Sequence, residues 1–244
     1  NQIFAEIKPD VLLHLASRAG VRASIADPEL YHEVNVVGTN ILLEACRRHS
    51  VNRIVFASSS SVYGNQKKTP FSETDETENP ISPYAATKRA AENLCYSYSK
   101  MYGLKINVLR FFTVYGPNGR PDMAPLMFTK AIDAGETIKR FGDGSSKRDY
   151  TFIDDIVSGI LSAVDNPFDF EIINLGNNKP EELRTLISTI EKNLGKTAII
   201  EELPMQAGDV EMTFADIGKA ERLLNYSPKT TLEQGIEKLI KWYK

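Results

Sequence analysis

Tyr84 and Lys88 are the two residues of this sequence whose spacing most directly suggests chemistry. They stand four apart in SPYAATK (82–88), at the start of an alanine-rich helical pattern. Residues i and i+4 share one face of a helix, so the phenol and the ammonium project together. A free tyrosine titrates near pH ~10, but a neighbouring ammonium and the positive helix end lower that pKa by roughly one to three units. Tyr84 is therefore a candidate general base for a substrate hydroxyl.

A serine run, Ser58–Ser61, supplies candidate hydroxyl groups for the same site. It ends the apolar stretch RIVFASSS (53–60) and lies 23 to 26 residues before Tyr84. A hydroxyl there can hydrogen-bond the substrate oxygen that Tyr84 would deprotonate. Each feature has a simpler interpretation by itself, a tyrosine packed on a lysine stem and a flexible serine loop. Only their combination favours a catalytic site.

Apolar runs and helical periodicities predict the elements that position these side chains. Asp27 as N-cap with Pro28 behind it starts one helix, and Gly103 ends another. Strand–helix–strand at this spacing implies right-handed crossovers and an α/β fold with a doubly wound parallel sheet. Ligand sites in such sheets lie in the loops that follow the strands, here HLASRAG, ASSSSVYG and FFTVYGP. The expected elements are buried strands within 9–17, 53–60 and 105–112, and helices over 28–49 and 83–102.

The pattern changes from about residue 120 onward. We interpret this part as a smaller C-terminal α/β lobe interleaved with the sheet. The expected division is a sheet domain over 1–119, which also receives part of 140–175, and a second lobe mainly over 120–244. The expected helices are 123–134, 153–165, 181–194, 216–224 and 231–243, with TIKRFGDG, EIINLG and TAIIEEL between them.

Composition describes an ordinary globular chain of 244 residues with a net charge of -3, which argues against nucleic acid as a partner. No apolar run approaches the roughly 18 residues that cross a bilayer, so no membrane partner is expected. Cys46 and Cys95 are expected to be buried thiols in a reducing compartment, the cytoplasm, and are too few for a metal site. The acidic stretch SETDETENP (72–80) is expected to be a solvated surface turn.

Eight stretches, taken in order, resemble the extended short-chain dehydrogenase/reductase family, and within it the NAD-dependent nucleotide-sugar epimerase/dehydratase enzymes. RFFTVYGPNGRPDMA is most similar to the UDP-glucuronate 4-epimerases. The resemblance implies a Rossmann-like sheet, NAD as cofactor and a UDP-sugar as substrate. The stretches are HLAS, NVVGTNILLEAC, FASSSSVYG, SPYAATKRAAE, LRFFTVYGPNGRPDMA, FGDGSSKRDYTFIDDIV, INLGN and AGDVEMTFADIGKAERLLNYSPKTTLEQGI.

The resemblance also implies the reaction, epimerisation at C4 of a UDP-sugar, and most closely UDP-glucuronate to UDP-galacturonate. Tyr84, helped by Ser59, would take the proton of the 4-hydroxyl while the C4 hydride moves to NAD. The 4-keto sugar would turn over and receive the hydride on its other face. Lys88 would hold the nicotinamide ribose. The remaining residues that the resemblance assigns to the cofactor site are His14, Leu15, Ala16, Ser17, Asn35, Ser58 and Phe111.

His14 and Asn35 keep a simpler interpretation beside this one, a satisfied core histidine and a helix-face amide. For the substrate, Ser60, Ser61 and Thr113 would offer hydroxyl donors to a uronate carboxylate, and Arg120 a charge-assisted hydrogen bond. The resemblance assigns Arg148 to the diphosphate, with a surface ion pair as the equal alternative. Asp209 would contact the uridine ribose.

Alternative reactions of the family differ in the residues that they need. The 4,6-dehydratases carry an Asp-Glu pair where this sequence has Ser60 and Ser61, so dehydration is disfavoured. UDP-glucose/UDP-galactose 4-epimerase remains the second hypothesis, although an asparagine there takes the place of Thr113. Oxidation at C4 of a uronate gives a β-keto acid that readily loses CO2, which keeps UDP-glucuronate decarboxylase as a further alternative.

The glycine-rich turn that the family uses for the cofactor pyrophosphate is missing from this sequence. The chain enters the family pattern at the helix before the fourth strand. We expect a segment of a longer epimerase; a short non-catalytic binding module and a second chain that completes the sheet remain alternatives. The resemblance also implies a homodimer through helices 28–49 and 83–102, with Leu42, Leu43, Leu94 and Tyr98 as candidates or as ordinary core residues.

Overall fold

A four-stranded parallel sheet lies at the centre of the fold, with strand order β1-β2-β3-β7. The computed structural model describes residues 2–204 and 211–244. Strands β2 and β3 pair in register up to Ser59 opposite Phe111, so the serine run leaves the sheet beside the end of the next strand. This arrangement confirms the α/β class and the parallel sheet. The strands are β1 (Leu12–His14), β2 (Arg53–Ser59), β3 (Lys105–Phe111) and β7 (Phe170–Leu175).

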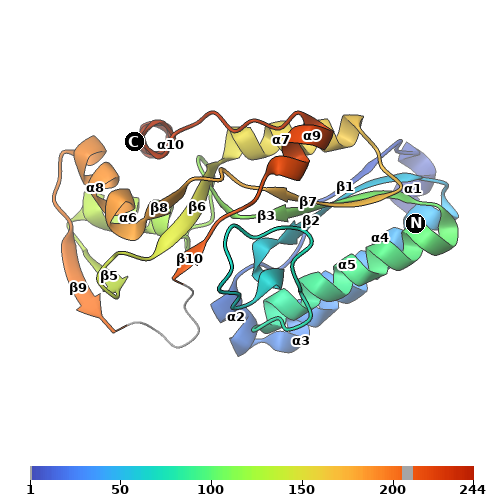
Figure 1. The fold of residues 1–244 in the computed structure, drawn as a ribbon, viewed down its shortest axis with the longest axis horizontal. Helices are drawn as coiled ribbons and strands as arrows, with labels where there is room; N and C mark the ends of the chain where they lie inside the picture. The colour runs from blue at the N-terminus through green and yellow to red at the C-terminus, as the bar shows by residue number, and fades with distance from the viewer. Residues whose placement is uncertain (1, 205–210) are drawn as a thin grey trace.

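Helices cover both faces of this sheet, as Figure 1 shows. Ile54 and Phe56 of β2 belong to the core beneath α4 and α5, whereas Val55 of the same strand belongs to the core beneath α7 and α9. A parallel sheet needs apolar cover on both faces, and the near-continuous apolar run of β2 supplies it. The four helices are α4 (Gly38–Arg48), α5 (Pro83–Tyr102), α7 (Ile153–Asp165) and α9 (Gly218–Leu224).

Strand β1 is an edge strand, which corrects the expectation of a buried strand over 9–17. Only three residues pair with β2, and Leu13 is 40% exposed. Among the described residues β1 pairs with β2 alone, and an apolar run does not by itself show that one side of a strand is open. A short helix that the sequence did not predict, α2 (Val21–Ala26), follows the strand, and α1 (Gln2–Ile7) precedes it.

The helix predicted over 28–49 forms with a π-helical segment inside it. Asp27 caps it as expected, accepting a 3.2 Å hydrogen bond from the Leu30 N–H. The chain then runs through α3 (Pro28–His32), the π-helical segment Glu33–Val37 and α4. Such segments insert an extra residue into a helical turn and are frequent at functional sites. Here the segment contains the buried Asn35.

Helix α5 forms as predicted. Ser82 Oγ accepts a hydrogen bond from the Ala85 N–H at 3.1 Å, and Pro83 occupies the first helical position. Gly103, with φ 68°, ends the helix in the left-handed region that glycine favours. Cys46 of α4 and Cys95 of α5 are buried free thiols in the core between these helices and the sheet, as expected.

A second core lies beyond the sheet, built around β6 and three helices. The stretch KRDYTF (147–152) forms β6, which the sequence did not reveal because its charged residues hide the strand pattern. Asp149 of β6 is fully buried and accepts the backbone N–H groups of Asn177, Asn178 and Ala215. The elements here are β4 (Thr113–Tyr115), α6 (Ala124–Ala134), β5 (Thr137–Phe141), β6 (Lys147–Phe152), β8 (Pro180–Glu182), α8 (Leu183–Leu194), β9 (Ile199–Leu203), β10 (Met212–Thr213) and α10 (Leu232–Tyr243).

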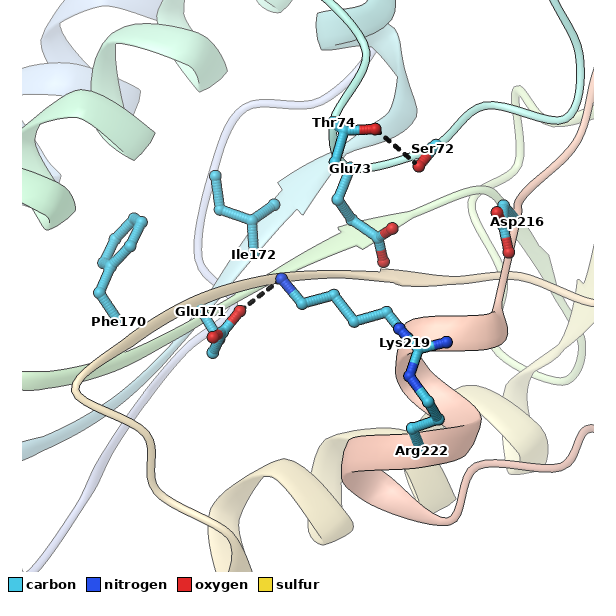
Figure 2. A pocket seen from close by; sticks show the side chains of 9 residues that line it. All are labelled: Ser72, Glu73, Thr74, Phe170, Glu171, Ile172, Asp216, Lys219 and Arg222. Atoms are coloured by element: carbon cyan, nitrogen blue, oxygen red, sulfur yellow. Dashed lines mark hydrogen bonds and ion pairs between the residues drawn. The ribbon is translucent and has the colours of Figure 1, made fainter.

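The free edge of β7 borders a hollow of about 450 Å³, which we call the edge pocket (Figure 2). The acidic stretch 72–80 lies against it, and this corrects the expectation of a purely solvated turn. Glu73 accepts the Asn174 N–H at 2.8 Å and so caps the strand edge. Burial raises the pKa of Glu73, and Lys219 opposes that shift. Lys219 also forms an ion pair with Glu171 across the pocket.

Among the described residues, no helix is both long and apolar enough to cross a bilayer.

Candidate active site

A cavity of about 510 Å³ opens at the carboxyl ends of β2 and β3, where the sequence predicted a site. We call it the strand-end cavity. It brings together residues from the loop after β1, the serine run, the start of α5 and the second core. The predicted site residues that line it are Ser58, Ser59, Ser60, Ser61, Tyr84, Phe111, Thr113, Arg120 and Arg148.

Tyr84 and Ser59 meet at this cavity. Tyr84 lies in the first turn of α5, and its phenol is near the Ser59 hydroxyl, which favours the phenolate and so lowers the pKa of Tyr84. The Tyr31 ring packs edge-on against the Tyr84 ring, with centroids 6.2 Å apart at 82°. Tyr31 is itself fixed by donating a 2.7 Å hydrogen bond to the Ala19 carbonyl. A substrate hydroxyl in the cavity would therefore meet a phenol of fixed orientation beside a second hydroxyl.

The pKa of Tyr84 differs from the prediction. Burial raises it above its ordinary value, while the Ser59 hydroxyl and the charge of Arg120 lower it. The sequence argument expected Lys88 to depress this pKa, and that expectation was wrong. Desolvation of the phenolate outweighs the favourable contacts because the ring is enclosed by protein.

Lys88 is buried one turn below Tyr84. Its ammonium donates a 2.8 Å hydrogen bond to the Ala57 carbonyl and lies 5.2 Å from the centre of the Phe56 ring. Burial lowers the pKa of Lys88 to about 8, against the raising effects of Cys95 and Glu92. Among the described residues the ammonium has no second hydrogen-bond acceptor. Two of its three donors thus remain for a ligand.

His14 lies in a hydrogen-bonded chain beneath the loop after β1. Its Nε2 is 3.0 Å from the Thr39 hydroxyl, and that hydroxyl donates to the Asn35 carbonyl at 2.6 Å. Since the single hydroxyl proton is used there, His14 Nε2 must be the donor. Burial, with a smaller effect of Lys88, lowers the pKa of His14 to about 4. The geometry matches the simpler interpretation of a satisfied core histidine.

Asn35 holds the loop after β1 in place. Its Oδ1 accepts the Arg18 N–H at 2.8 Å, and its Nδ2 donates to the Arg18 carbonyl and to the Thr87 hydroxyl, both at 3.0 Å. Asn35 therefore links that loop to α5 instead of pointing into the strand-end cavity. The predicted cofactor residues that do not line the cavity are His14, Leu15, Ala16, Ser17, Asn35 and Lys88.

The serine run is ordered by its own hydrogen bonds. Ser59 Oγ accepts the Ser61 N–H at 3.2 Å and donates to the Ser61 hydroxyl at 3.1 Å. A short 3-10 helix over Ser60–Tyr63 follows, so the run is a structured turn and the flexible-loop interpretation was wrong. Ser60, Ser61 and Thr113 are each half-buried and face the same cavity.

The strand-end cavity is strongly cationic. Four cationic side chains line it, together with one carboxylate, that of Asp122. Asp122 forms a bidentate ion pair with Arg120, and the guanidinium of Arg22 stacks over the Phe141 ring at 5.2 Å. The sequence analysis missed Arg22 and Lys139; the position of Arg22 in the loop after a predicted strand was the available signal. The four cations are Arg22, Arg120, Lys139 and Arg148.

Asp209, predicted to contact the uridine ribose, lies outside the described residues. Within the described ranges, 2–204 and 211–244, no group of His, Cys, Asp or Glu side chains has the arrangement of a metal site.

The fold and the cavity together define a class: Rossmann-like enzymes in which a Tyr-x-x-x-Lys helix and a serine turn meet at the strand ends. The family model of the NAD dependent epimerase/dehydratase family matches residues 1–176. The chain belongs to this family, as its sequence predicted.

Similar proteins agree with that assignment. The UDP-glucuronate 4-epimerase of Thermodesulfobacterium geofontis is 45% identical over 99% of this chain and 75% of its own length. The crystal structure of UDP-glucuronic acid 4-epimerase from Bacillus cereus, with UDP-glucuronic acid and NAD, has a TM-score of 0.92 and 38% identity over 99% of this chain and 76% of its own. A UDP-glucose 4-epimerase from Thermotoga maritima, with UDP-glucose, has a TM-score of 0.94 and 31% identity over 99% and 79%.

NAD is the cofactor of this family. The residues described here fit the nicotinamide end of NAD. Tyr84 lines the strand-end cavity, and Lys88, one turn below it, has two N–H donors that no protein group accepts among the described residues. The described residues include no glycine-rich turn for the pyrophosphate.

Proposed function

We propose that this protein epimerises UDP-glucuronate to UDP-galacturonate at C4 of the sugar. The observation that carries the proposal is the charge of the strand-end cavity, four cations against one carboxylate. A UDP-uronate brings two diphosphate charges and a carboxylate, one negative charge more than UDP-glucose. An apposed cation and hydroxyl donors offset the cost of burying that carboxylate.

Each residue of the cavity has a proposed part in the reaction. Tyr84 takes the proton of the 4-hydroxyl, and the Ser59 hydroxyl holds the same oxygen. When bound, NAD would supply the hydride chemistry at C4, removal and return of one hydride, so that the sugar would pass through a 4-keto form. Lys88, one turn below Tyr84, would hold the nicotinamide ribose with its remaining donors. Tyr84 then returns the proton to the O4 of the inverted sugar.

Ser60, Ser61, Thr113 and Arg120 are proposed to hold the uronate carboxylate. The 4-keto form of the sugar is a β-keto acid. It retains CO2 only if the bond between C5 and the carboxylate is kept from aligning with the π system of the ketone. Hydroxyl groups at two adjacent strand ends would bind the carboxylate from fixed backbone positions, and Arg120, which lines the same cavity, would add a positive charge. Arg148 is proposed to bind the diphosphate with a charge-assisted hydrogen bond.

The two cores correspond to two proposed functional regions of the chain. The sheet region, mainly 1–119, carries the base and the cofactor contacts, and the lobe mainly within 120–244 binds the sugar nucleotide. Segments 153–175 and 215–226 add to the sheet core from the later part of the chain. The buried free thiols Cys46 and Cys95 support a reducing compartment, the cytoplasm.

Product analysis tests the proposed reaction. The protein is incubated with NAD and, separately, UDP-glucuronate and UDP-glucose, and the sugar nucleotides are identified by proton NMR. The proposal expects UDP-galacturonate from the first and little turnover of the second. UDP-galactose as the faster product would favour the UDP-glucose hypothesis. UDP-xylose with CO2 would favour decarboxylation.

We also propose a homodimer through α4 and α5. The residues named from sequence do not carry this proposal, because Leu43 is buried and Leu42, Leu94 and Tyr98 pack against the sheet core. Other apolar side chains of the two helices are exposed, including Ile41 at 61% and Met101 at 69%. Sedimentation should give a dimer that Ile41→Glu dissociates, with an exposed-site control such as Ile199→Glu on β9 leaving it intact.

A further inference from the structure

Glu92 lies on α5 two turns below Tyr84, and its carboxylate is completely buried. It accepts the Ser58 hydroxyl at 2.6 Å and the Arg110 Nε and Nη2 groups at 2.9 and 2.8 Å. Arg89 adds a longer contact at 3.2 Å. One carboxylate thus joins the ends of β2 and β3 to the helix that carries the base.

Helix α5 lies against the end of β2 through residues spaced four apart. The Lys88 ammonium donates to the Ala57 carbonyl, and the Glu92 carboxylate accepts the Ser58 hydroxyl. Tyr84, one turn above Lys88, lies beside Ser59, whose hydroxyl lowers its pKa. The lowest tie, from Ser58 to Glu92, fixes the position of the helix along its axis relative to the serine run.

The ion pair is poorly explained by stability alone. Burying two charges costs desolvation, and apolar residues of similar volume often replace such pairs without loss. Arg110 Nη1 is buried with no hydrogen-bond acceptor among the described residues, and its guanidinium lies over the Tyr63 ring at 4.8 Å. The arrangement points instead to a geometric requirement at the neighbouring site.

We propose that Glu92 is a positioning residue of the proposed epimerase. By accepting the Ser58 hydroxyl, it fixes the position of α5 along the helix axis relative to β2. Tyr84 and Ser59 can then contact the same substrate oxygen. Arg110 neutralises the carboxylate and orients it toward Ser58. This inference rests on the proposed function, because the substrate oxygen is that of the C4 hydroxyl. Neither Glu92 nor Arg110 lines the strand-end cavity, so both act through Ser58 and Ser59.

Two double variants separate the effect of the Ser58–Glu92 hydrogen bond from that of the Glu92–Arg110 ion pair. Glu92→Gln with Arg110→Met removes the charges but keeps an acceptor for Ser58, whereas Glu92→Leu with Arg110→Met removes both. We expect the first to keep kcat within about threefold of the parent. We expect the second to lose kcat by about 10- to 100-fold at unchanged KM, the size of a misplacement of about 1 Å. Equal kcat in the two folded variants, whether high or low, would overturn the proposal.

Two further measurements keep the test decisive. If either double variant fails to fold by circular dichroism, Ser58→Ala, which leaves the ion pair intact, must reproduce the kcat loss; full activity of Ser58→Ala would overturn the proposal. The second measurement needs no turnover. Carbon-13 NMR of labelled tyrosine follows the titration of Tyr84, whose pKa should rise when the tie is lost because the effect of the Ser59 hydroxyl that lowers it is weakened. An unchanged titration would contradict positioning, whereas a parent without epimerase activity would contradict the proposed function alone.

Discussion

The strand-end cavity and the edge pocket are hollows of similar size, about 510 and 450 Å³, with opposite electrostatic character. The edge pocket contains the cations Lys219 and Arg222 against three carboxylates, and Lys219 is already paired with Glu171. The strand-end cavity has four cations against one carboxylate. Volume therefore does not distinguish a binding site here. An unbalanced charge does, together with a base and hydroxyl groups at the ends of parallel strands.

The largest effect is expected from the base. Tyr84→Phe should lower the rate of C4 epimerisation by about 10²- to 10⁴-fold, because the proton of the 4-hydroxyl loses its acceptor. Binding of the UDP-sugar, measured by calorimetry, should persist. Tyr96→Phe on the same helix is the matched control, since this ring packs against Phe170 at the edge pocket. Loss of activity in the control, or its retention in Tyr84→Phe, would contradict the assignment.

The buried His14 should make the free energy of unfolding depend on pH. The pKa of His14 is about 4 in the folded protein against 6.5 ordinarily, so the unfolded chain binds this proton first. Stability should fall as the pH drops from about 6.5 to about 4, by up to about 3 kcal/mol. Urea unfolding gives the free energy of unfolding of the parent and of His14→Gln. The free energy of the parent relative to the variant should decrease as the pH is lowered. A constant difference from pH 7 to 4 would refute it.

Substitution of one arginine in each hollow compares the two directly. Arg148→Met should weaken the binding of UDP-glucuronate by about 10- to 100-fold, because a charge-assisted hydrogen bond to the diphosphate is lost. Arg222→Met in the edge pocket should leave the dissociation constant unchanged. Calorimetric titrations of the two variants decide between the hollows, and the reverse pattern would move the binding site to the β7 edge.

The smallest effect is expected at the edge pocket. Burial raises the pKa of Glu73, so the carboxylate form disfavours folding once the pH exceeds the ordinary pKa of 4.5. Glu73→Gln retains an acceptor for the Asn174 N–H and should be slightly more stable than the parent at pH 7. That gain should vanish below about pH 4.5, where both side chains are neutral. Thermal unfolding measures it, with the exposed Glu78→Gln of the same loop as the control.

The sequence predicted the features that local patterns determine. Helix α5 begins at Pro83 and ends before Gly103 because its cap and its terminating glycine are local signals. The convergence of the serine run, Tyr84 and Thr113 followed from the rule that parallel strands end at one edge. Arg120 was inferred from its position seven residues beyond Thr113, whereas Arg148 came from the family resemblance.

The features that the sequence did not reveal depend on tertiary contacts. The pKa of Tyr84 is set by enclosure, which a helical spacing does not describe. Strand β6 contains a buried Asp149 that three backbone N–H groups satisfy, and charge patterns read such a residue as exposed. The tie from Ser58 to Glu92 joins residues 34 apart in the chain, so it becomes visible only in the folded protein.

The most direct test of the account is a pair of calorimetric titrations of the protein with UDP-glucuronate and with UDP-glucose in the presence of NAD. The cationic surplus of the strand-end cavity predicts at least about tenfold tighter binding of the uronate, as one extra charge-assisted contact provides. The advantage should shrink in Arg120→Met. Equal affinities for the two ligands, or tighter binding of UDP-glucose, would contradict the central claim that this cavity selects a uronate.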